Sequence, residues 1–398
     1  MTKKILIILL TIIIFIGGFY QLHIRNIDIE TSDGVLSVSG DNESDYVFEA
    51  KDEIFEIIDN MSLHEKICQM IIVAPEILTD TQPSPTSGDS IKNALSEYPV
   101  GGLIYFANNL ESQDQTKEMI NTTKQYAKDL SLLPLFYSVD EEGGIVARCA
   151  SKLGTTKFSP MYNYRNEGTE TAYNNAKTIA EDISRLGFNL DFAPVADTWS
   201  NKENTVIGAR AYSDDYSQTA ELVASAVKGF NDGGVYCTLK HFPGHGDTSG
   251  DSHHEKVYID KTVDELSGNE YLAFESGITA GADFVMMGHI IIQELDSLPA
   301  SLSYKVINDE LKAKLGYKGI VITDSLAMGA VSKLYDADEL AVMAVKAGND
   351  ILLMPSDLEL AVNGIKNAIE EGEITEERID ESVRKILETK SKNLKIGT

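Results

Sequence analysis

The sequence is poor in basic residues and in cysteine. Lysine and arginine number 34 against 62 aspartates and glutamates in 398 residues, which gives a formal net charge of −28 at pH 7. Nucleic-acid binding depends on clustered positive charge, so this balance argues against a nucleic-acid partner. The three cysteines, Cys68, Cys149 and Cys237, are widely spaced and lie among apolar residues. They match neither a disulfide framework nor a zinc-site spacing, so we expect buried free thiols.

A long apolar run occurs at the N-terminus, from Ile5 to Phe19, directly after Lys3 and Lys4. A positively charged start followed by an apolar stretch is typical of a signal sequence. No clear small-residue cleavage site follows, so residues 1–24 are predicted to be an uncleaved signal-anchor, with a cleaved signal peptide as the alternative. The lysines are expected to stay in the cytoplasm. The rest of the chain is then expected at the extracellular face of the membrane, or secreted.

Residues 25–52 are acidic and rich in small polar side chains, and they are predicted to be a linker. From residue 53 to residue 398, short apolar runs alternate with amphipathic stretches. The predicted strands are Gln69–Ala74, Gly102–Phe106, Leu135–Asp140, Asn189–Ala193, Val235–Lys240, Asp283–Met287, Gly319–Thr323 and Asp350–Met354. The predicted helices include Asp114–Leu130, Thr169–Leu186, Tyr216–Asp232, Val263–Ala280 and Ala337–Ala347.

Strands that alternate with helices in one long series predict a parallel sheet. Eight such units predict a closed (β/α)8 barrel of the TIM type, with a doubly wound open sheet as the alternative. The tail from Ile374 to Ile396 places apolar residues on one helical face and is predicted to be a packing helix. These residues are Ile379, Val383, Ile386 and Leu387.

The densest group of reactive side chains lies between Lys240 and His254, where the sequence reads KHFPGHGDTSGDSHH. Four of the seven histidines, one lysine and two aspartates fall in this stretch. Three glycines and a proline interrupt any helix or strand period, so most of it is predicted to be a loop. The preceding run, Val235–Leu239, predicts a buried strand that ends at Lys240 and His241.

Three interpretations fit a loop of this composition. It could be a solvated surface loop. It could be a metal site, whose ligands would be His245, Asp247, Asp251 and His253. It could also serve acid–base catalysis, because Asp251 can hydrogen-bond the imidazole of His253 two residues further on and fix its tautomer. The residues alone leave the metal and acid–base alternatives open.

Charged side chains follow several predicted strands. Asp140 ends one strand, Lys240 and His241 end another, and Asp324 follows a third. Catalytic groups of a parallel barrel gather at the carboxyl ends of its strands, so we expect these side chains at one mouth. Two of them also have a simpler interpretation. Asp324 could cap the next helix, and Asp140 could form a salt bridge with Arg148.

The run KHFPGHGDT followed by DSH resembles the signature of glycoside hydrolase family 3, in its β-N-acetylglucosaminidase branch. The resemblance extends from about Met61 to about Thr389. It implies that Asp324, within TDSLAMGA, is the nucleophile, that His253 is the acid/base, and that Asp251 orients His253. The substrate-binding residues that it implies are Asp140, Arg148, Arg210, Lys240 and His241. Arg210 lies in a segment that departs from the family pattern, with Thr205 at the usual proline, and His254 has no assigned role.

The resemblance implies a retaining exo-β-N-acetylglucosaminidase that removes terminal β-GlcNAc from peptidoglycan fragments or related glycans, including chitin oligomers. It implies no metal and no cofactor. Alternatives are a β-N-acetylglucosaminide phosphorylase, a broader β-glucosidase, a metallohydrolase that uses the His/Asp loop, and a non-catalytic sugar-binding protein. Partners are a GlcNAc-containing oligosaccharide and, through the N-terminal segment, the membrane; a monomer is favoured. The second sandwich domain of many family members is not expected.

Overall fold

The computed structural model describes residues 53–252 and 256–393. The predicted signal-anchor and acidic linker lie outside the described residues, as do His253 and His254. Within the described ranges, no helix combines the length and apolarity that crossing a bilayer requires.

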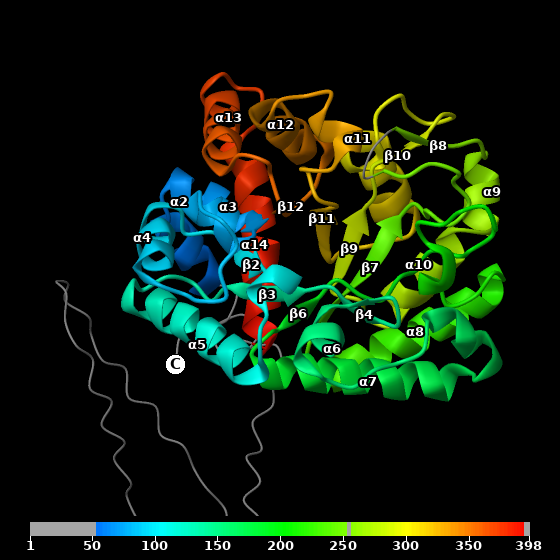
Figure 1. The fold of residues 1–398 in the computed structure, drawn as a ribbon. Helices are drawn as coiled ribbons and strands as arrows, with labels where there is room; N and C mark the ends of the chain where they lie inside the picture. Colours follow the sequence, from blue (N-terminus) through cyan, green and yellow to red (C-terminus); the bar gives the residue numbers. More distant parts are fainter. Residues whose placement is uncertain (1–52, 253–255, 394–398) are drawn as a thin grey trace, which may run out of the picture. The chain divides into compact units, whose positions relative to one another are not determined.

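Eight parallel strands form the barrel at the centre of the molecule (Figure 1). They are β1 (Ile71–Val73), β2 (Gly102–Ile104), β3 (Phe136–Val139), β6 (Leu190–Asp191), β7 (Tyr236–Phe242), β9 (Phe284–Met287), β11 (Ile320–Thr323) and β12 (Leu352–Leu353). Hydrogen-bonded neighbours follow the order β11, β9, β7, β6, β3, β2, β1 and β12. A parallel bridge between Ile322 and Ile351 joins the two ends of this series. The predicted (β/α)8 barrel is therefore confirmed, and the open sheet is wrong.

Each predicted apolar run overlaps one barrel strand, and β7 extends two residues beyond the predicted end at Lys240. The strands are short and nearly all of their side chains are buried, which explains why they read as continuous apolar runs without alternation. Parallel pairing places Ile72 opposite Gly102 and Leu190 opposite Tyr236. The longest strand, β7, continues through Lys240 and His241, and its pairing with β9 is irregular between Leu239 and Phe242.

Helices surround the barrel (Figure 1). A helical stretch at residues 53–60 precedes the others. The longer helices are α2 (Leu63–Gln69), α4 (Asp89–Glu97), α5 (Gln113–Asp129), α7 (Thr169–Leu186), α8 (Tyr216–Asp232), α10 (Tyr271–Thr279), η5 (Lys305–Lys314), α12 (Ala337–Ala347), α13 (Leu358–Glu370) and α14 (Glu376–Asn393). The short ones are α3 (Pro75–Thr79), η1 (Ala107–Asn109), α6 (Arg148–Leu153), η2 (Met161–Asn166), η3 (Gly208–Arg210), α9 (Val263–Gly268), η4 (Ala300–Leu302) and α11 (Gly329–Ser332).

One predicted helix, Val263–Ala280, is wrong as a single element. The chain forms α9 and α10 instead, with a break at Asn269 and Glu270. Glycine and asparagine are poor helix formers, and the run Gly268–Asn269 interrupts the helical backbone. The predicted helix start at Val263 is confirmed, because Thr262 caps α9 in a capping box with Glu265.

Two small sheets accompany the barrel and were not predicted. The hairpin of β4 (Glu141–Gly143) and β5 (Val146–Ala147) follows β3 directly. The strands β8 (Val257–Ile259) and β10 (Ile290–Ile292) pair in parallel after β7 and β9. Both sheets therefore extend from the carboxyl ends of barrel strands.

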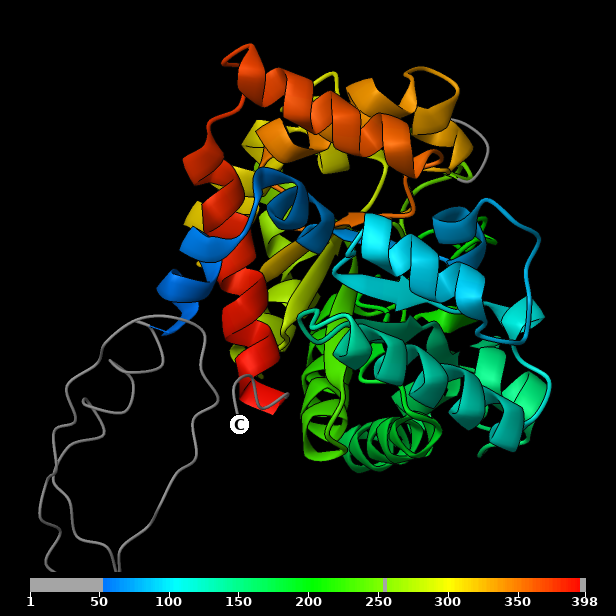
Figure 2. The same cartoon turned by 90° about the vertical axis from the view of Figure 1, so that its left-hand side faces the viewer.

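The C-terminal helix α14 packs along α2 (Figure 2). The predicted packing face is confirmed, because Ile379, Val383, Ile386 and Leu387 are all fully buried. The predicted buried free thiols are also confirmed, since the three cysteines are buried and unpaired.

Candidate active site

The predicted strand-end residues lie at one rim of the barrel. Asp140 follows β3, Lys240 and His241 lie among the last three residues of β7, and Asp324 follows β11. These strands are parallel members of one barrel, so their carboxyl ends open on the same side. Side chains that are far apart in the sequence are thus brought to a common mouth.

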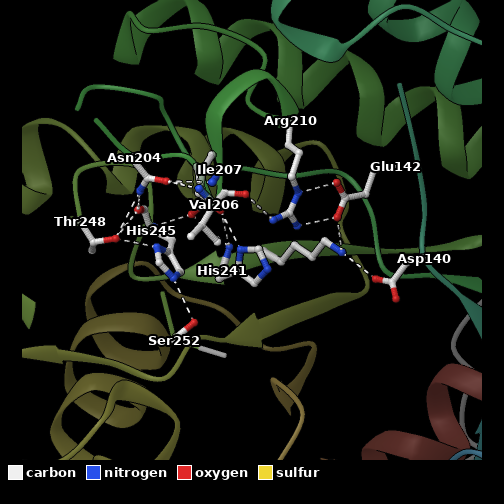
Figure 3. Close-up of polar contacts among 12 residues, drawn as sticks. Asp140, Glu142, Asn204, Val206, Ile207, Arg210, His241, His245, Thr248 and Ser252 are labelled. Carbon is white, nitrogen blue, oxygen red and sulfur yellow. Dashed lines mark hydrogen bonds and ion pairs between the residues drawn. The ribbon is translucent and has the colours of Figure 1, made fainter. Parts of the chain in front are cut away.

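A largely buried ion-pair cluster joins Asp140, Glu142, Arg210 and Lys240 (Figure 3). The Nζ atom of Lys240 lies 2.8 Å from Oδ1 of Asp140 and 2.7 Å from Oε1 of Glu142. Arg210 binds Glu142 through two parallel hydrogen bonds, from Nε to Oε2 at 2.9 Å and from Nη2 to Oε1 at 2.7 Å. Glu142, on β4, therefore connects cations that come from β7 and from η3.

The charges in this cluster stabilise one another. Burial acts to raise the pKa of Glu142, but Arg210 and Lys240 outweigh it and hold that pKa well below its ordinary value. Burial acts to lower the pKa of Lys240, whereas Asp140 and Glu142 raise it above its ordinary value. Both groups therefore stay charged at neutral pH.

The cluster retains hydrogen-bonding capacity for a ligand. Lys240 has three ammonium hydrogens, and its two carboxylate contacts use two of them. Arg210 has five N–H groups, and its contacts with Glu142 and the Val206 carbonyl use three. Asp140 remains 19% exposed at its side chain. Fixed donors beside an accessible carboxylate suit the hydroxyl groups of a sugar ring.

His241 is oriented by the buried carboxylate of Asp197. Nδ1 of His241 lies 2.7 Å from Oδ2 of Asp197, and Oδ1 of the same carboxylate accepts from the backbone N–H groups of His241 and His245. An ionised carboxylate only accepts hydrogen bonds, so Nδ1 carries the proton. Nε2 is then the nitrogen of His241 that a ligand can use.

Asp324 is partly exposed and is held in its ionised form. Burial acts to raise its pKa, but the nearby His241 and His289 lead the effects that lower it below its ordinary value. The backbone N–H of Ser325 donates to Oδ1 at 2.7 Å, and the charge of Lys240 acts in the same direction. Asp324 therefore lies within electrostatic reach of Lys240 and His241 near the end of β7.

His289 supports the backbone that follows Asp324. Its Nε2 atom lies 2.8 Å from the carbonyl oxygen of Ser325, and its Nδ1 atom lies 2.7 Å from the hydroxyl of Ser301. A carbonyl only accepts, so Nε2 donates to Ser325. The turn that carries Asp324 is thereby tied to the residues that follow β9.

Arg148 lies at the first residue of α6 and does not pair with Asp140 in the described part of the chain. Its charge lowers the pKa of Glu141, whose carboxylate also accepts from the backbone N–H groups of Cys149 and Ala150. Burial is the larger effect and raises the pKa of Glu141 to about 7. The buried Nε atom of Arg148 has no hydrogen-bond partner among the residues described.

The loop after β7 is built around His245. Its Nδ1 atom lies 2.7 Å from the Thr248 hydroxyl, and its Nε2 atom lies 3.1 Å from the Ser252 hydroxyl. The side-chain amide of Asn204 donates to the carbonyl oxygen of His245 at 2.7 Å (Figure 3). Burial lowers the pKa of His245, so the ring is neutral at pH 7. Asp251 is partly buried. The contact between His245 and Ser252 holds the loop directly after Asp251.

The ligands of the metal alternative have other partners. Both ring nitrogens of His245 contact hydroxyls, and the two carboxylate oxygens of Asp247 contact Ser200 and Lys261. Among residues 53–252 and 256–393, no group of three His, Cys, Asp or Glu side chains is arranged to hold a metal ion. His253, the fourth ligand of that alternative, lies outside these ranges.

Three site residues were missed by the sequence analysis, namely Glu142, Asp197 and His289. Each of them follows a barrel strand within a few residues, after β3, β6 and β9. The rule that selected Asp140 and Asp324 would have selected them as well, had it been applied to every strand.

Residues 62–389 match the glycosyl hydrolase family 3 N-terminal domain. The chain belongs to glycosyl hydrolase family 3. Among curated members of this family, it is 32% identical to Beta-hexosaminidase A from Pseudoalteromonas piscicida over 76% of its own length. It is 30% identical to Beta-hexosaminidase LpqI from Mycobacterium tuberculosis, over 84% of each chain.

Family 3 structures show the same fold. A β-N-acetylglucosaminidase of glycoside hydrolase family 3 from a Paenibacillus species superimposes with a TM-score of 0.80 at 36% identity, over 85% of this chain. The structure of LpqI from M. tuberculosis gives a TM-score of 0.72 at 28% identity. The chain spans 55% of the Pseudoalteromonas relative, 64% of the Paenibacillus structure and 95% of the LpqI structure.

Proposed function

We propose that this family 3 chain is a retaining exo-β-N-acetylglucosaminidase, in which Asp324 is the nucleophile, His253 is the acid/base and Asp251 orients His253. One observation carries the proposal. Asp324 is partly exposed, its carboxylate has a lowered pKa, and it follows β11 at the same barrel mouth as the ion-pair cluster that suits sugar hydroxyls. A nucleophile must be ionised, and the substrate must be held beside it.

The reaction takes two steps. In the first, Asp324 attacks the anomeric carbon, the bond to the aglycone oxygen breaks, and His253 gives its proton to that oxygen. In the second, His253 takes a proton from water, the water oxygen attacks the anomeric carbon, and the bond to Asp324 breaks. Asp324 returns to its carboxylate form, and the anomeric configuration is retained.

The substrate-binding residues hold the terminal sugar. Lys240 and Arg210 donate to the sugar through the N–H groups that do not contact protein acceptors. Asp140 accepts hydrogen bonds from sugar hydroxyls. His241 contributes Nε2, because Asp197 holds its other nitrogen. Arg148 completes the set.

The substrate is a terminal β-GlcNAc residue. The names of the relatives, beta-hexosaminidase and β-N-acetylglucosaminidase, support this choice. Because the N-terminal residues read as a signal-anchor, we propose that the enzyme acts outside the membrane on peptidoglycan fragments, with chitin oligomers as a second substrate.

The direct test compares nitrophenyl β-GlcNAc with nitrophenyl β-glucoside, with and without phosphate. We expect β-GlcNAc to be cleaved faster, at a rate that does not depend on phosphate. Phosphate-dependent release with a sugar phosphate as product would establish the phosphorylase alternative instead, because a neutral imidazole does not repel an anionic acceptor. Faster cleavage of the glucoside would contradict the proposed substrate.

The matching variant is Asp324→Ala. Loss of the nucleophile is expected to lower kcat by about 10³-fold or more while the affinity for a GlcNAc-containing ligand changes little. Full activity in this variant would overturn the assignment, since no covalent intermediate could then form at Asp324. Affinity measured by calorimetry separates lost chemistry from lost binding.

A further inference from the structure

Lys261 lies outside the KHFPGHGDT–DSH run, yet it contacts that run. Its Nζ atom lies 3.1 Å from Oδ2 of Asp247, and the side chain is 19% exposed. Lys261 follows β8, whereas Asp247 precedes Asp251 in the loop after β7. The ion pair therefore joins the two ends of the segment 247–261, which contains Asp251.

Lys261 is itself fixed to the helices behind the loop. Its Nζ atom donates to Oε1 of Glu270 at 2.5 Å and to the hydroxyl of Tyr216 at 3.1 Å. Glu270 is buried and precedes α10, and Tyr216 begins α8. Burial acts to lower the pKa of Lys261, but Glu270 leads the contacts that raise it, so the ammonium form persists.

Asp247 is held on its other side as well. Its Oδ1 atom accepts from the hydroxyl of Ser200 at 2.9 Å, and its carbonyl oxygen accepts from the side-chain amide of Asn201 at 3.3 Å. An added Cβ at Gly246 would lie 1.8 Å from the carbonyl oxygen of Thr198, so the backbone there is in close contact with the loop after β6. The part of the loop before Asp251 is therefore fixed at Asp247. Lys261 connects this fixed point to the part of the chain that follows β8.

We propose that Asp247 and Lys261 form a clasp that positions Asp251, the residue proposed to orient the acid/base, by joining the described stretches on either side of it. The Asp247 carboxylate and the Lys261 ammonium contact each other and neighbouring protein side chains, so we assign them as positioning residues and not catalytic ones. The inference rests on the proposed function, in which Asp251 and His253 transfer the proton. Loss of the clasp should therefore weaken proton transfer more than attack by Asp324.

The test variant is Asp247→Asn, which keeps the shape of the side chain, the hydrogen bond from Ser200 and the pair between Lys261 and Glu270. The value of kcat/KM reports the first step, in which a poor leaving group needs a proton and a good one does not. For a GlcNAc disaccharide, we expect kcat/KM to fall about tenfold to a hundredfold, because a misplaced acid costs rate on this scale. For dinitrophenyl β-GlcNAc, we expect kcat/KM to stay within about twofold, and kcat and KM to fall together because the second step needs the base.

Two further variants control the measurement. Asp214→Asn removes a similar partly exposed ion pair, with Lys202 at 2.7 Å. This variant should leave kcat/KM unchanged for both substrates. Asp247→Glu keeps the charge on a longer arm and should retain at least about half of the activity on the disaccharide. Thermal melting of all variants shows that they fold.

The variant His253→Ala distinguishes a failure of the clasp from a failure of the proposed acid/base. A strong leaving-group dependence in both His253→Ala and Asp247→Asn supports the clasp. The same dependence in His253→Ala with a uniform loss, or no loss, in Asp247→Asn overturns the clasp and leaves the proposed function standing. If His253→Ala affects both substrates equally, the proposed acid/base is wrong, and the clasp fails with it.

Discussion

Glu142 is the residue through which the cations of the barrel mouth are held together. It pairs with both Arg210 and Lys240, and its own side chain is only 2% exposed. Removing one partner of a buried ion pair leaves the others without compensation, which costs more than the pair contributes. Glu142 is thus expected to matter for stability and for substrate affinity alike.

Glu142→Gln is the corresponding prediction at this scale. Arg210 would lose the one carboxylate with which it pairs among the described residues, whereas Lys240 would keep Asp140. We expect the free energy of unfolding to fall by about 3 kcal/mol, measured by chemical denaturation, because a buried charge is left unpaired. We also expect kcat/KM for a β-GlcNAc substrate to fall at least about tenfold, mainly through a higher KM, since donors to the sugar lose their orientation.

Glu310→Gln is the matched control. Glu310 is also largely buried and pairs with Lys314, but it lies on η5 and does not contact the cluster. This variant should leave KM unchanged. An unchanged KM in Glu142→Gln as well would show that the cluster does not position the sugar.

The sequence predicted several residues of the mouth because strand ends are marked by composition. Asp140, Lys240 and Asp324 each follow a buried apolar run, and the parallel topology alone brings such positions together. Their pairing was not predictable in the same way. The salt bridge that the sequence suggested for Asp140 was with Arg148, but the structure pairs Asp140 with Lys240, which is 100 residues away.

At the scale of single elements, α14 contains a buried lysine. Lys390 is fully buried and donates to Oε1 of Gln69 at 2.9 Å and to the carbonyl oxygen of Gly101 at 3.0 Å. Its Nζ atom also lies 4.9 Å from the centre of the Phe136 ring. No carboxylate within the described residues pairs with it, and burial lowers its pKa to about 7.

This lowered pKa makes stability depend on pH. Between about pH 7 and the ordinary pKa of 10.5, the unfolded chain binds a proton at Lys390 that the folded chain does not bind. The free energy of unfolding therefore rises with pH across this window, by at most about 5 kcal/mol for a shift of this size. Below pH 7 the amine of Lys390 is protonated in both the folded and the unfolded chain. The folded chain then carries the full free-energy cost of burying the charged ammonium.

Lys390→Met is expected to remove this rise. Chemical denaturation at pH 7 and pH 9.5 should show wild type gaining stability relative to the variant as pH increases. Lys392→Met is the control, because Lys392 lies on the same helix but is 64% exposed. Parallel stability curves for wild type and Lys390→Met would show that the lysine keeps an ordinary pKa.

The position of Lys390 was implicit in the sequence, but its burial was not. It continues the spacing of Val383, Ile386 and Leu387 on the apolar face of α14. A lysine at the end of such a face normally extends to solvent. Here the side-chain oxygen of Gln69, the backbone carbonyl of Gly101 and the ring of Phe136 receive the ammonium group. These partners come from the end of α2, the residue before β2 and the strand β3, so no local pattern in α14 could reveal them.

At the scale of the whole molecule, the barrel was predictable and its additions were not. Eight apolar runs separated by helices are compatible with few topologies. A closed parallel barrel is the one that buries all eight runs as strands. The hairpin β4–β5 and the pair β8–β10 consist of short strands without a clear period. These additions form after the barrel strands have ended, where tertiary contacts decide the backbone.

The central claim is that Asp324 becomes covalently bound to the sugar at this mouth. A slowly turning over fluorinated β-GlcNAc analogue should trap the glycosyl-enzyme, and mass spectrometry of the digested protein locates the adduct. We predict one GlcNAc-type adduct on the peptide that contains Asp324, and none in Asp324→Ala. An adduct on another carboxylate, such as Asp140 or Glu142, or turnover with no adduct at all, would contradict the account.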